Sequence, residues 1–122
     1  MEKKDKIFEK IKPALKISLV GNEKFFGKGI EELLTLIDKY GTVTKACNIM
    51  GLSYSKAWKI INRLENEIGF KIVEGKAGGT SGGKTTLTND AKELLSKYSK
   101  FAKDVEKYAD KSYKKYFIIK GI

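Results

Sequence analysis

Side chains that can hydrogen-bond to nucleic acid recur between residues 53 and 63. They are Ser53, Ser55, Lys56, Lys59, Asn62 and Arg63. Lysine and arginine can bind guanine acceptors or phosphates, an asparagine amide can pair with adenine, and hydroxyls near a helix N-terminus can bind phosphate. The pattern predicts the outer face of a helix that enters the major groove of double-stranded DNA. A solvated face on any helical domain has the same composition. The elements around this helix are therefore needed to distinguish a DNA-binding face from an ordinary solvated one.

Those elements have the spacing of a helix-turn-helix between Val43 and Leu64. A helix is expected from its cap at Ser53 to about Ile68, with Gly69 as its stop. Its apolar stripe consists of Ala57, Ile60, Ile61, Leu64 and Ile68, and the preceding helix, capped by Thr42 or Thr44, has apolar positions at Val43, Ala46, Cys47 and Met50. A helix-turn-helix needs a small residue at the crossing and a turn glycine that accepts positive φ; Cys47 and Gly51 meet these needs.

This spacing makes 53–68 the candidate recognition helix, and Thr44 and Lys45 on the preceding helix are further candidates for DNA contact. Tyr54 and Trp58 lie four residues apart, so their rings should stack along one edge of the recognition helix. We expect them to pack on neighbouring elements; contact with DNA sugars is the alternative.

A glycine-rich segment follows the candidate recognition helix. Residues 70–74 suit a strand, 75–83 contain five glycines, and 85–88 are β-branched enough to return as a second strand. This predicts a wing hairpin with its tip at residues 75–84, where Lys76, Thr80 and Lys84 can meet the DNA backbone.

The same glycines formally match a phosphate-binding loop. Gly78 to Thr85 fits the pattern G-x-x-x-x-G-K-[ST], which would make the protein a nucleotide-binding enzyme. That loop has to leave a buried strand and open into a helix at its lysine. Because Lys84 is followed by strand-like residues, we regard nucleotide binding as the less favoured reading and the wing as the better one.

Other elements frame this segment. Met1 to Lys12 suits a short helix ended by Pro13, and residues 15–20 alternate like a half-buried strand that 24–26 can pair as a hairpin. A helix is expected over Ile30 to Tyr40, with Gly41 as its cap.

A long last helix is expected over about 89–112, capped by Thr88 or Asn89. Its apolar face, which the pattern predicts to be buried, consists of Leu94, Leu95, Tyr98, Phe101, Ala102, Val105, Tyr108 and Ala109. Such a face exceeds what a small core can cover, so a homodimer is expected, with folding back onto the first helix as the alternative. Residues 113–122 receive no assignment.

Composition restricts the chemistry. The 122 residues suit one domain, with its core at about 15–98, and carry a net charge of +10, which favours a polyanionic partner. The basic surplus includes residues 53–84, which contain six lysines and arginines and three acidic residues.

The chain contains no histidine, so catalytic triads and zinc sites that need one are excluded. No cofactor, enzyme activity or small-molecule effector site is evident from the sequence. The single Cys47 reads as a small core residue. A charged N-terminus and the lack of a long apolar run favour a cytoplasmic protein without membrane contact.

Several motifs together resemble a known family. They are Phe26-Gly27-Lys28-Gly29, Leu33-Leu34, Ile37, Gly41 to Ala46, Gly51 to Trp58, Val73-Glu74, Gly78-Gly79, Gly82-Gly83 and Leu87-Thr88. This set, within about Leu15 to Tyr98, is similar to the N-terminal domain of the molybdate-responsive regulator ModE, and more distantly to the LysR-type helix-turn-helix.

The resemblance implies a mainly α winged helix-turn-helix with a small antiparallel sheet, the third helix in the major groove and dimerisation through terminal helices. It implies that Ser53, Ser55, Lys56, Lys59 and Arg63 face DNA and that Lys76, Thr80 and Lys84 lie on the wing. Cys47 departs from the family's usual alanine, a small change in packing. The chain has no segment resembling the oxyanion-binding domain, so molybdate sensing is not carried over. The expected function is sequence-specific DNA binding as a transcription regulator; non-specific architectural DNA binding is the alternative.

Overall fold

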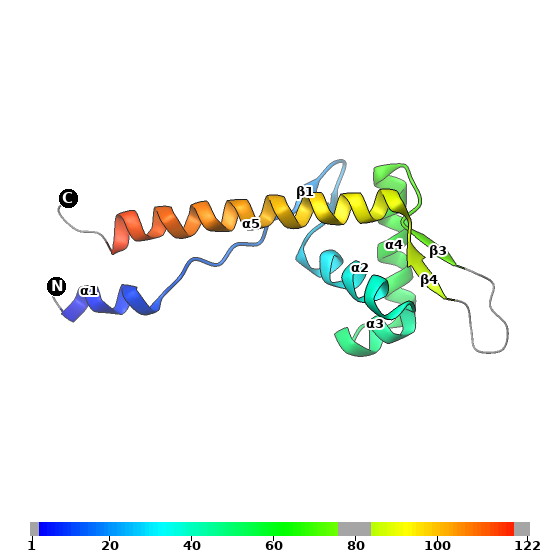
Figure 1. The fold of residues 1–122 in the computed structure, drawn as a ribbon, viewed down its shortest axis with the longest axis horizontal. Coiled ribbons are helices and arrows are strands. Elements are labelled where there is room, and N and C mark those ends of the chain that lie inside the picture. Colours follow the sequence, from blue (N-terminus) through cyan, green and yellow to red (C-terminus); the bar gives the residue numbers. More distant parts are fainter. Residues whose placement is uncertain (1–2, 76–83, 119–122) are drawn as a thin grey trace. The chain divides into compact units, whose positions relative to one another are not determined.

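Helices dominate the computed structural model, which describes residues 3–75 and 84–118 (Figure 1). The chain divides into two compact parts, residues 17–98 and residues 1–16 with 99–122, which are described separately. The first contains the helices α2 (Lys28–Tyr40), α3 (Val43–Met50) and α4 (Tyr54–Ile68), and the beginning of the long α5 (Asn89–Phe117).

The sequence sets the ends of these helices. The hydroxyl of Thr42 accepts a hydrogen bond from the backbone N–H of Lys45 (3.0 Å), and that of Ser53 accepts one from Lys56 (3.1 Å). Because these bonds satisfy donors that the first helical turn leaves free, they fix where α3 and α4 begin. Gly41, Gly51 and Gly69 end α2, α3 and α4 in the left-handed conformation. The expected boundaries of α3 and α4 are thereby confirmed.

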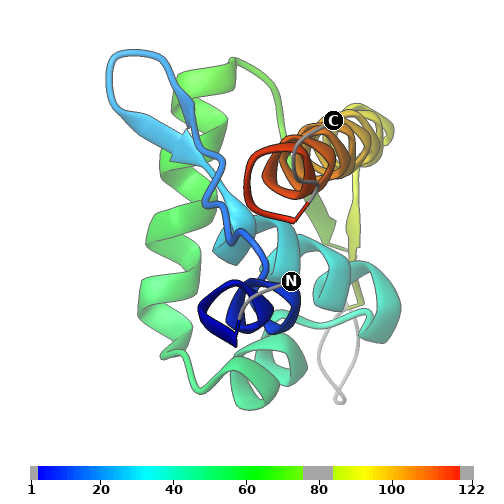
Figure 2. The same cartoon turned by 90° about the vertical axis from the view of Figure 1, so that its left-hand side faces the viewer.

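Two short antiparallel sheets accompany the helices (Figure 2). β1 (Leu19–Val20) pairs with β2 (Lys24–Phe26), and β3 (Val73–Gly75) pairs with β4 (Thr85–Leu87). The hairpin expected from 15–20 and 24–26 is present, but its first strand is only two residues long. Burial still alternates from residue 15 to 20, although the short β2 offers residues 15–18 no strand to pair with.

The strand expected over 70–74 also begins late, at Val73, because side chains bind the backbone before it. The N–H of Ile72 donates to Oε2 of Glu65 at 2.9 Å, and the carbonyl of Lys71 accepts from the Thr88 hydroxyl at 2.6 Å. These bonds join the start of β3 to α4 and to the residue that caps α5, where the Thr88 hydroxyl also accepts from the N–H of Ala91.

The core of residues 17–98 lies between α2, α4 and the sheets. Its largest fully buried side chains are Phe26, Leu33, Leu34, Ile37, Ile61, Leu64 and Ile72. The beginning of α5 closes this core through Tyr98, whose ring lies 4.7 Å from that of Phe26 and whose hydroxyl donates to the carbonyl of Ile17 at 2.6 Å. Burial of each such side chain stabilises the fold by roughly 1.5–3 kcal/mol.

The second part joins the N-terminal segment to the end of α5. α1 (Lys3–Lys6) continues into a 3-10 turn (Ile7–Lys10). The Tyr113 hydroxyl donates to the Phe8 carbonyl at 2.7 Å, and Phe117 lies 5.2 Å from the Phe8 ring and 4.8 Å from the Tyr113 ring. Residues 113–117, which the sequence left unassigned, form the last turn of α5.

The expected burial of the α5 apolar face is wrong at two aromatic residues, and five of the other six expected residues are only half-buried. Tyr98 is buried, but Phe101 is 48% exposed and Tyr108 is 72% exposed. The reason is that the buried hydrophobic side chains of the described residues end at Tyr98, so the later turns of α5 lie beyond this core. Within residues 3–75 and 84–118, every helix is too short or too polar to span a lipid bilayer.

Two glycine-to-alanine substitutions should have different effects on the free energy of unfolding. Gly51 has a φ of +66° and Gly29 lies in the first turn of α2, and an added Cβ would meet no neighbour within 4 Å at either position. Gly51→Ala should therefore destabilise the fold by about 1–2 kcal/mol through backbone strain alone. Gly29→Ala should be neutral or stabilise it by less than about 1 kcal/mol. Urea unfolding checks both values, and equal losses would contradict the assigned backbone conformations.

Candidate nucleic-acid interface

The turn between α3 and α4 brings the two helices close together. Only residues 51–53 separate them, and the N–H groups of Gly51 and Leu52 both donate to the carbonyl of Cys47. Small buried residues face this region: Ala46 and Ala57 are fully buried and Cys47 is 4% exposed. None of these side chains is larger than that of cysteine, so the two helices can approach each other closely. The turn then directs α4 away from α3.

The outer face of α4 presents its polar side chains to solvent. Ser55, Lys56, Lys59, Asn62 and Arg63, all selected from the sequence, are exposed. At 100° per residue, Ser55, Lys59 and Asn62 lie within about 60° of one another and opposite the buried Leu64 and Ala57. Ser53 has a different role, because its hydroxyl caps α4 and already accepts a backbone hydrogen bond.

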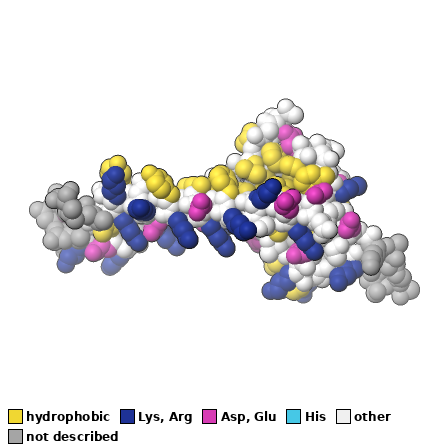
Figure 3. Space-filling model, turned by 45° about the horizontal axis from the view of Figure 1, so that its top comes forward, with side chains coloured by type: hydrophobic (Ala, Val, Ile, Leu, Met, Phe, Trp, Pro, Cys, Tyr) yellow, Lys and Arg dark blue, Asp and Glu magenta, His cyan; other side chains and the backbone are white. Residues whose placement is uncertain are grey.

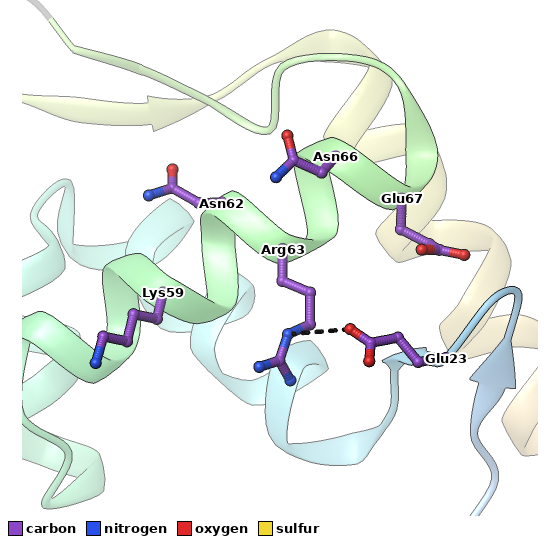
Figure 4. A pocket seen from close by; sticks show the side chains of 6 residues that line it. All are labelled: Glu23, Lys59, Asn62, Arg63, Asn66 and Glu67. Atoms are coloured by element: carbon purple, nitrogen blue, oxygen red, sulfur yellow. Dashed lines mark ion pairs between the residues drawn. The ribbon is translucent and has the colours of Figure 1, made fainter.

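Asn66 extends this row and was not among the residues expected from the sequence. It is exposed and lies four residues after Asn62, so both amides project from the same side of α4 (Figure 4). The helical spacing that singled out Asn62 would also have identified Asn66. We call Ser55, Lys59, Asn62 and Asn66 the polar row.

Arg63, one of the residues expected to contact DNA, forms an ion pair with the β1–β2 turn. Nε of Arg63 lies 3.7 Å from a carboxylate oxygen of Glu23, and both side chains are more than half exposed (Figure 4). Next to this pair, the N–H of Asn22 donates to Oε1 of Glu67 at 2.7 Å. These contacts place the turn against the C-terminal half of α4 and direct Arg63 toward the hairpin, away from Asn62 and Asn66.

An open groove lies between the hairpin turn and α4. Its volume is about 430 Å³, and its lining residues are Glu23, Lys59, Asn62, Arg63, Asn66 and Glu67. All six side chains are polar or charged, so the groove suits hydrogen bonding to a polar ligand more than burial of an apolar one.

A second basic region forms where β4 begins. The N–H of Thr85 donates to the carbonyl of Gly41 at 2.8 Å, and the Lys84 stem lies 3.4 Å from the position that a Cβ on Gly41 would occupy. Gly41 directly precedes the cap of α3, so Lys84 lies near the helix that carries Thr44 and Lys45, both exposed. The Lys45 ammonium is also 5.7 Å from the ring centre of Tyr40.

Lys76, Thr80 and most of the segment from Gly78 to Thr85 lie outside the described residues. Lys84 and Thr85 are described, and Thr85 begins a strand that runs to Leu87. A phosphate-binding loop requires a helix at this point, so the local structure disagrees with the nucleotide-binding reading.

Tyr54 and Trp58 contact each other on α4. Their rings are 6.2 Å apart in an edge-to-face arrangement, as their spacing predicted. Tyr54 is 56% exposed and Trp58 is half-buried, so Tyr54 has most of its ring available to solvent.

Two further features concern metal binding and the single cysteine. No group of His, Cys, Asp and Glu side chains there could hold a metal ion. Cys47 is buried at the helix crossing, as expected of a core residue, and burial raises the pKa of its thiol. Because the thiolate is the reactive form, Cys47 is poorly suited to act as a nucleophile or redox switch.

Comparison with known proteins shows that this chain is distantly similar to molybdenum-related proteins. Molybdenum-pterin-binding protein MopA of Rhodobacter capsulatus is 33% identical over 82 residues, 67% of this chain and 31% of that protein. Molybdenum transport protein ModE of Azotobacter vinelandii is 33% identical over 66 residues, 54% of this chain and 24% of that protein. The ModE protein of Herbaspirillum seropedicae is 34% identical over 74 residues, 61% of this chain and 26% of that protein.

These matches show distant homology to the N-terminal portion of ModE and of the molybdenum-pterin-binding proteins, and they confirm the family likeness seen in the sequence motifs. The chain spans between 24% and 31% of the length of these relatives. No family model matches it.

Cys47 should be slow to alkylate in the folded protein. Its thiol is buried and its pKa is raised, so both access and thiolate fraction are low. At pH 8 we expect iodoacetamide to modify it at least about tenfold more slowly than in denaturant. Because the folded pKa is the higher one, the folded rate should keep rising at alkaline pH after the unfolded rate has levelled. Equal rates at pH 8 would contradict this placement.

Proposed function

We propose that this chain is a winged helix-turn-helix protein that binds double-stranded DNA in a sequence-specific manner as a transcription regulator. In this proposal α4 lies in the major groove and residues 75–84 contact the DNA backbone. The observation that carries it is the polar row on α4, which lies opposite a buried apolar stripe on a helix joined to α3 by a tight turn. Distant homology to the N-terminal portion of ModE, whose family resemblance implies such a domain, supports it.

The polar row is long enough to reach several neighbouring base pairs in a major groove. Residues 55 to 66 rise about 16 Å along the helix axis. The groove admits one helix, so side chains on a single line of α4 can reach successive base edges. Lys59 supplies a donor for guanine or phosphate, and Asn62 can form a bidentate pair with adenine. Arg63, which Glu23 holds toward the hairpin, is then better placed for phosphate than for bases.

The region around Gly41 supplies a second contact with the DNA backbone. The N-terminus of α3 carries partial positive charge, and Lys45 and Lys84 add two full charges in its neighbourhood. Contacts of this kind position a protein on DNA without reading its sequence and make binding strongly dependent on salt.

We also propose that the chain dimerises through its second part, because the described residues there leave large hydrophobic side chains exposed. All the buried hydrophobic side chains lie between Phe26 and Tyr98, so the described residues of the second part contribute none. Its exposed large hydrophobics are Ile7, Ile11, Phe101, Tyr108, Tyr116 and Phe117. Figure 3 shows hydrophobic side chains along one edge of α5 and lysines along the other. A second copy is the partner that would cover this apolar edge and would give an isologous interface.

Selection from a random duplex library tests the DNA-binding proposal. We expect enrichment of an inverted repeat whose half-sites are about 34–36 Å apart, one duplex turn. Steeply salt-dependent binding without enrichment would favour an architectural DNA-binding protein, for which the net charge of +10 is suited. No binding at low salt would refute both DNA-binding functions.

Charge substitutions test the assigned contacts. Lys59→Glu should weaken binding to the selected duplex at least about 100-fold, because it replaces a donor in the groove with a repelled carboxylate. Lys84→Ala should weaken all duplexes by a similar, smaller factor and lower the salt dependence by about one ion. Lys92→Glu, an exposed lysine on α5, is the matched control and should have little effect. Unchanged affinity for Lys59→Glu would show that the wrong face was chosen.

The proposed dimer can be measured by sedimentation. The wild-type protein should sediment as a dimer at tens of micromolar, and Phe101→Glu should make it a monomer by placing a charge on the apolar edge. Lys103→Glu also introduces an acid on α5, but on the lysine edge, and should remain dimeric. A monomeric wild-type protein would rule out this interface.

A further inference from the structure

A second groove lies beneath the turn between α3 and α4 and is separate from the polar one. Its volume is about 290 Å³, close to the small end of the roughly 300–1,000 Å³ range of small-molecule pockets. Two lysines, two glycines and five apolar residues line it. They come from β2, the cap and first two turns of α2, the end of α3, the following turn and the middle of α4.

The floor of this groove is apolar. Leu33 is fully buried, whereas Ile30, Met50, Leu52 and Ile60 are half-buried and have part of their surface open to solvent. An apolar ligand would therefore remove hydrophobic surface from water on both sides of the contact.

The rim of the groove is cationic. Lys24 and Lys28 are both exposed, and no acidic residue lines the groove. The first turn of α2, which forms one wall, begins at Gly27 without a side-chain cap, and Gly29 leaves open space beside its backbone. The partial positive charge of this helix end adds to that of the two lysines. Such a rim is complementary to a negative group next to an apolar body.

We propose that this groove binds a small organic carboxylate with an apolar chain or ring. The carboxylate lies by Lys24, Lys28 and the first turn of α2, and the apolar body covers Met50, Leu52 and Ile60. The site does not depend on the proposed DNA-binding function.

Occupancy of the groove bears on the orientation of α4. Met50 and Leu52 flank Gly51, the left-handed residue of the turn, and Ile60 belongs to α4 itself. A ligand in contact with both helices can therefore bias the angle between them, and its differential affinity for two such angles would alter DNA binding.

Methionine NMR tests the site directly, because the chain has only two methionines, Met1 and Met50. With 13C-methyl methionine, sodium octanoate should shift the Met50 signal in a saturable manner and leave that of Met1 unchanged. Neutral octanamide should bind at least about fivefold more weakly, since it lacks the charge that the lysines recognise. Lys28→Glu should weaken octanoate binding to a similar degree, and Lys92→Glu should not.

Three outcomes would overturn the proposal. They are a Met50 signal that does not respond to octanoate, equal affinity for octanamide, and a Met50 shift that follows protein concentration alone, which would assign the groove to a second copy. The effect on DNA is measured separately, as the affinity for the selected duplex with saturating octanoate; we expect a change of at least about threefold. Octanoate binding without such a change would remove the regulatory consequence but retain the site. Failure of DNA binding itself would leave the NMR result unaffected.

Discussion

The close crossing of α3 and α4 is the constraint on which the rest of the structure depends. A left-handed residue at position 51 allows the chain to leave one helix and enter the next within three residues, and the carbonyl of Cys47 accepts both N–H groups that this turn frees. The small side chains of Ala46, Cys47 and Ala57 make the close approach possible. Once the crossing is made, the apolar stripe of α4 has to face α2 and the sheets, and the polar row consequently faces solvent. The direction of the proposed DNA-binding surface is thus decided by packing on the opposite side of the helix.

Local chemistry explains which parts of this arrangement the sequence could predict. A hydroxyl before a helix and a glycine after it act within four residues of chain, so Thr42, Ser53, Gly51 and Gly69 located α3 and α4 correctly. The contacts that the sequence could not reveal join residues far apart: Asn22 binds Glu67, and Glu23 pairs with Arg63. No periodicity marks such a pair, because an exposed acid on a hairpin turn looks the same whether it meets a helix or water. The effect on the candidate site is specific, since the sequence leaves Arg63 a choice of base or phosphate and the structure turns its side chain toward the hairpin.

The expectation that the whole apolar face of α5 is buried failed for a related reason. An apolar stripe shows that a helix needs to be covered, but not by what. The first turns of α5 are covered by the core through Ala91 and Tyr98, whereas Phe101 and Tyr108 continue the same stripe beyond it. Asn66, in contrast, was recoverable, because it repeats the helical spacing of Asn62. The apolar groove was beyond sequence reasoning, since its lining comes from five separate elements that only the fold brings together.

The hydrogen bonds at the base of β3 and β4 have a further consequence. Glu65 holds the N–H of Ile72, Thr88 holds the carbonyl of Lys71, and Gly41 accepts from Thr85. All of these residues lie outside the stretch 76–83, so the two strands are anchored to the helices independently of what connects them. The positions of β3 and β4 on the helices are therefore set at the base of the hairpin, by contacts made outside residues 76–83.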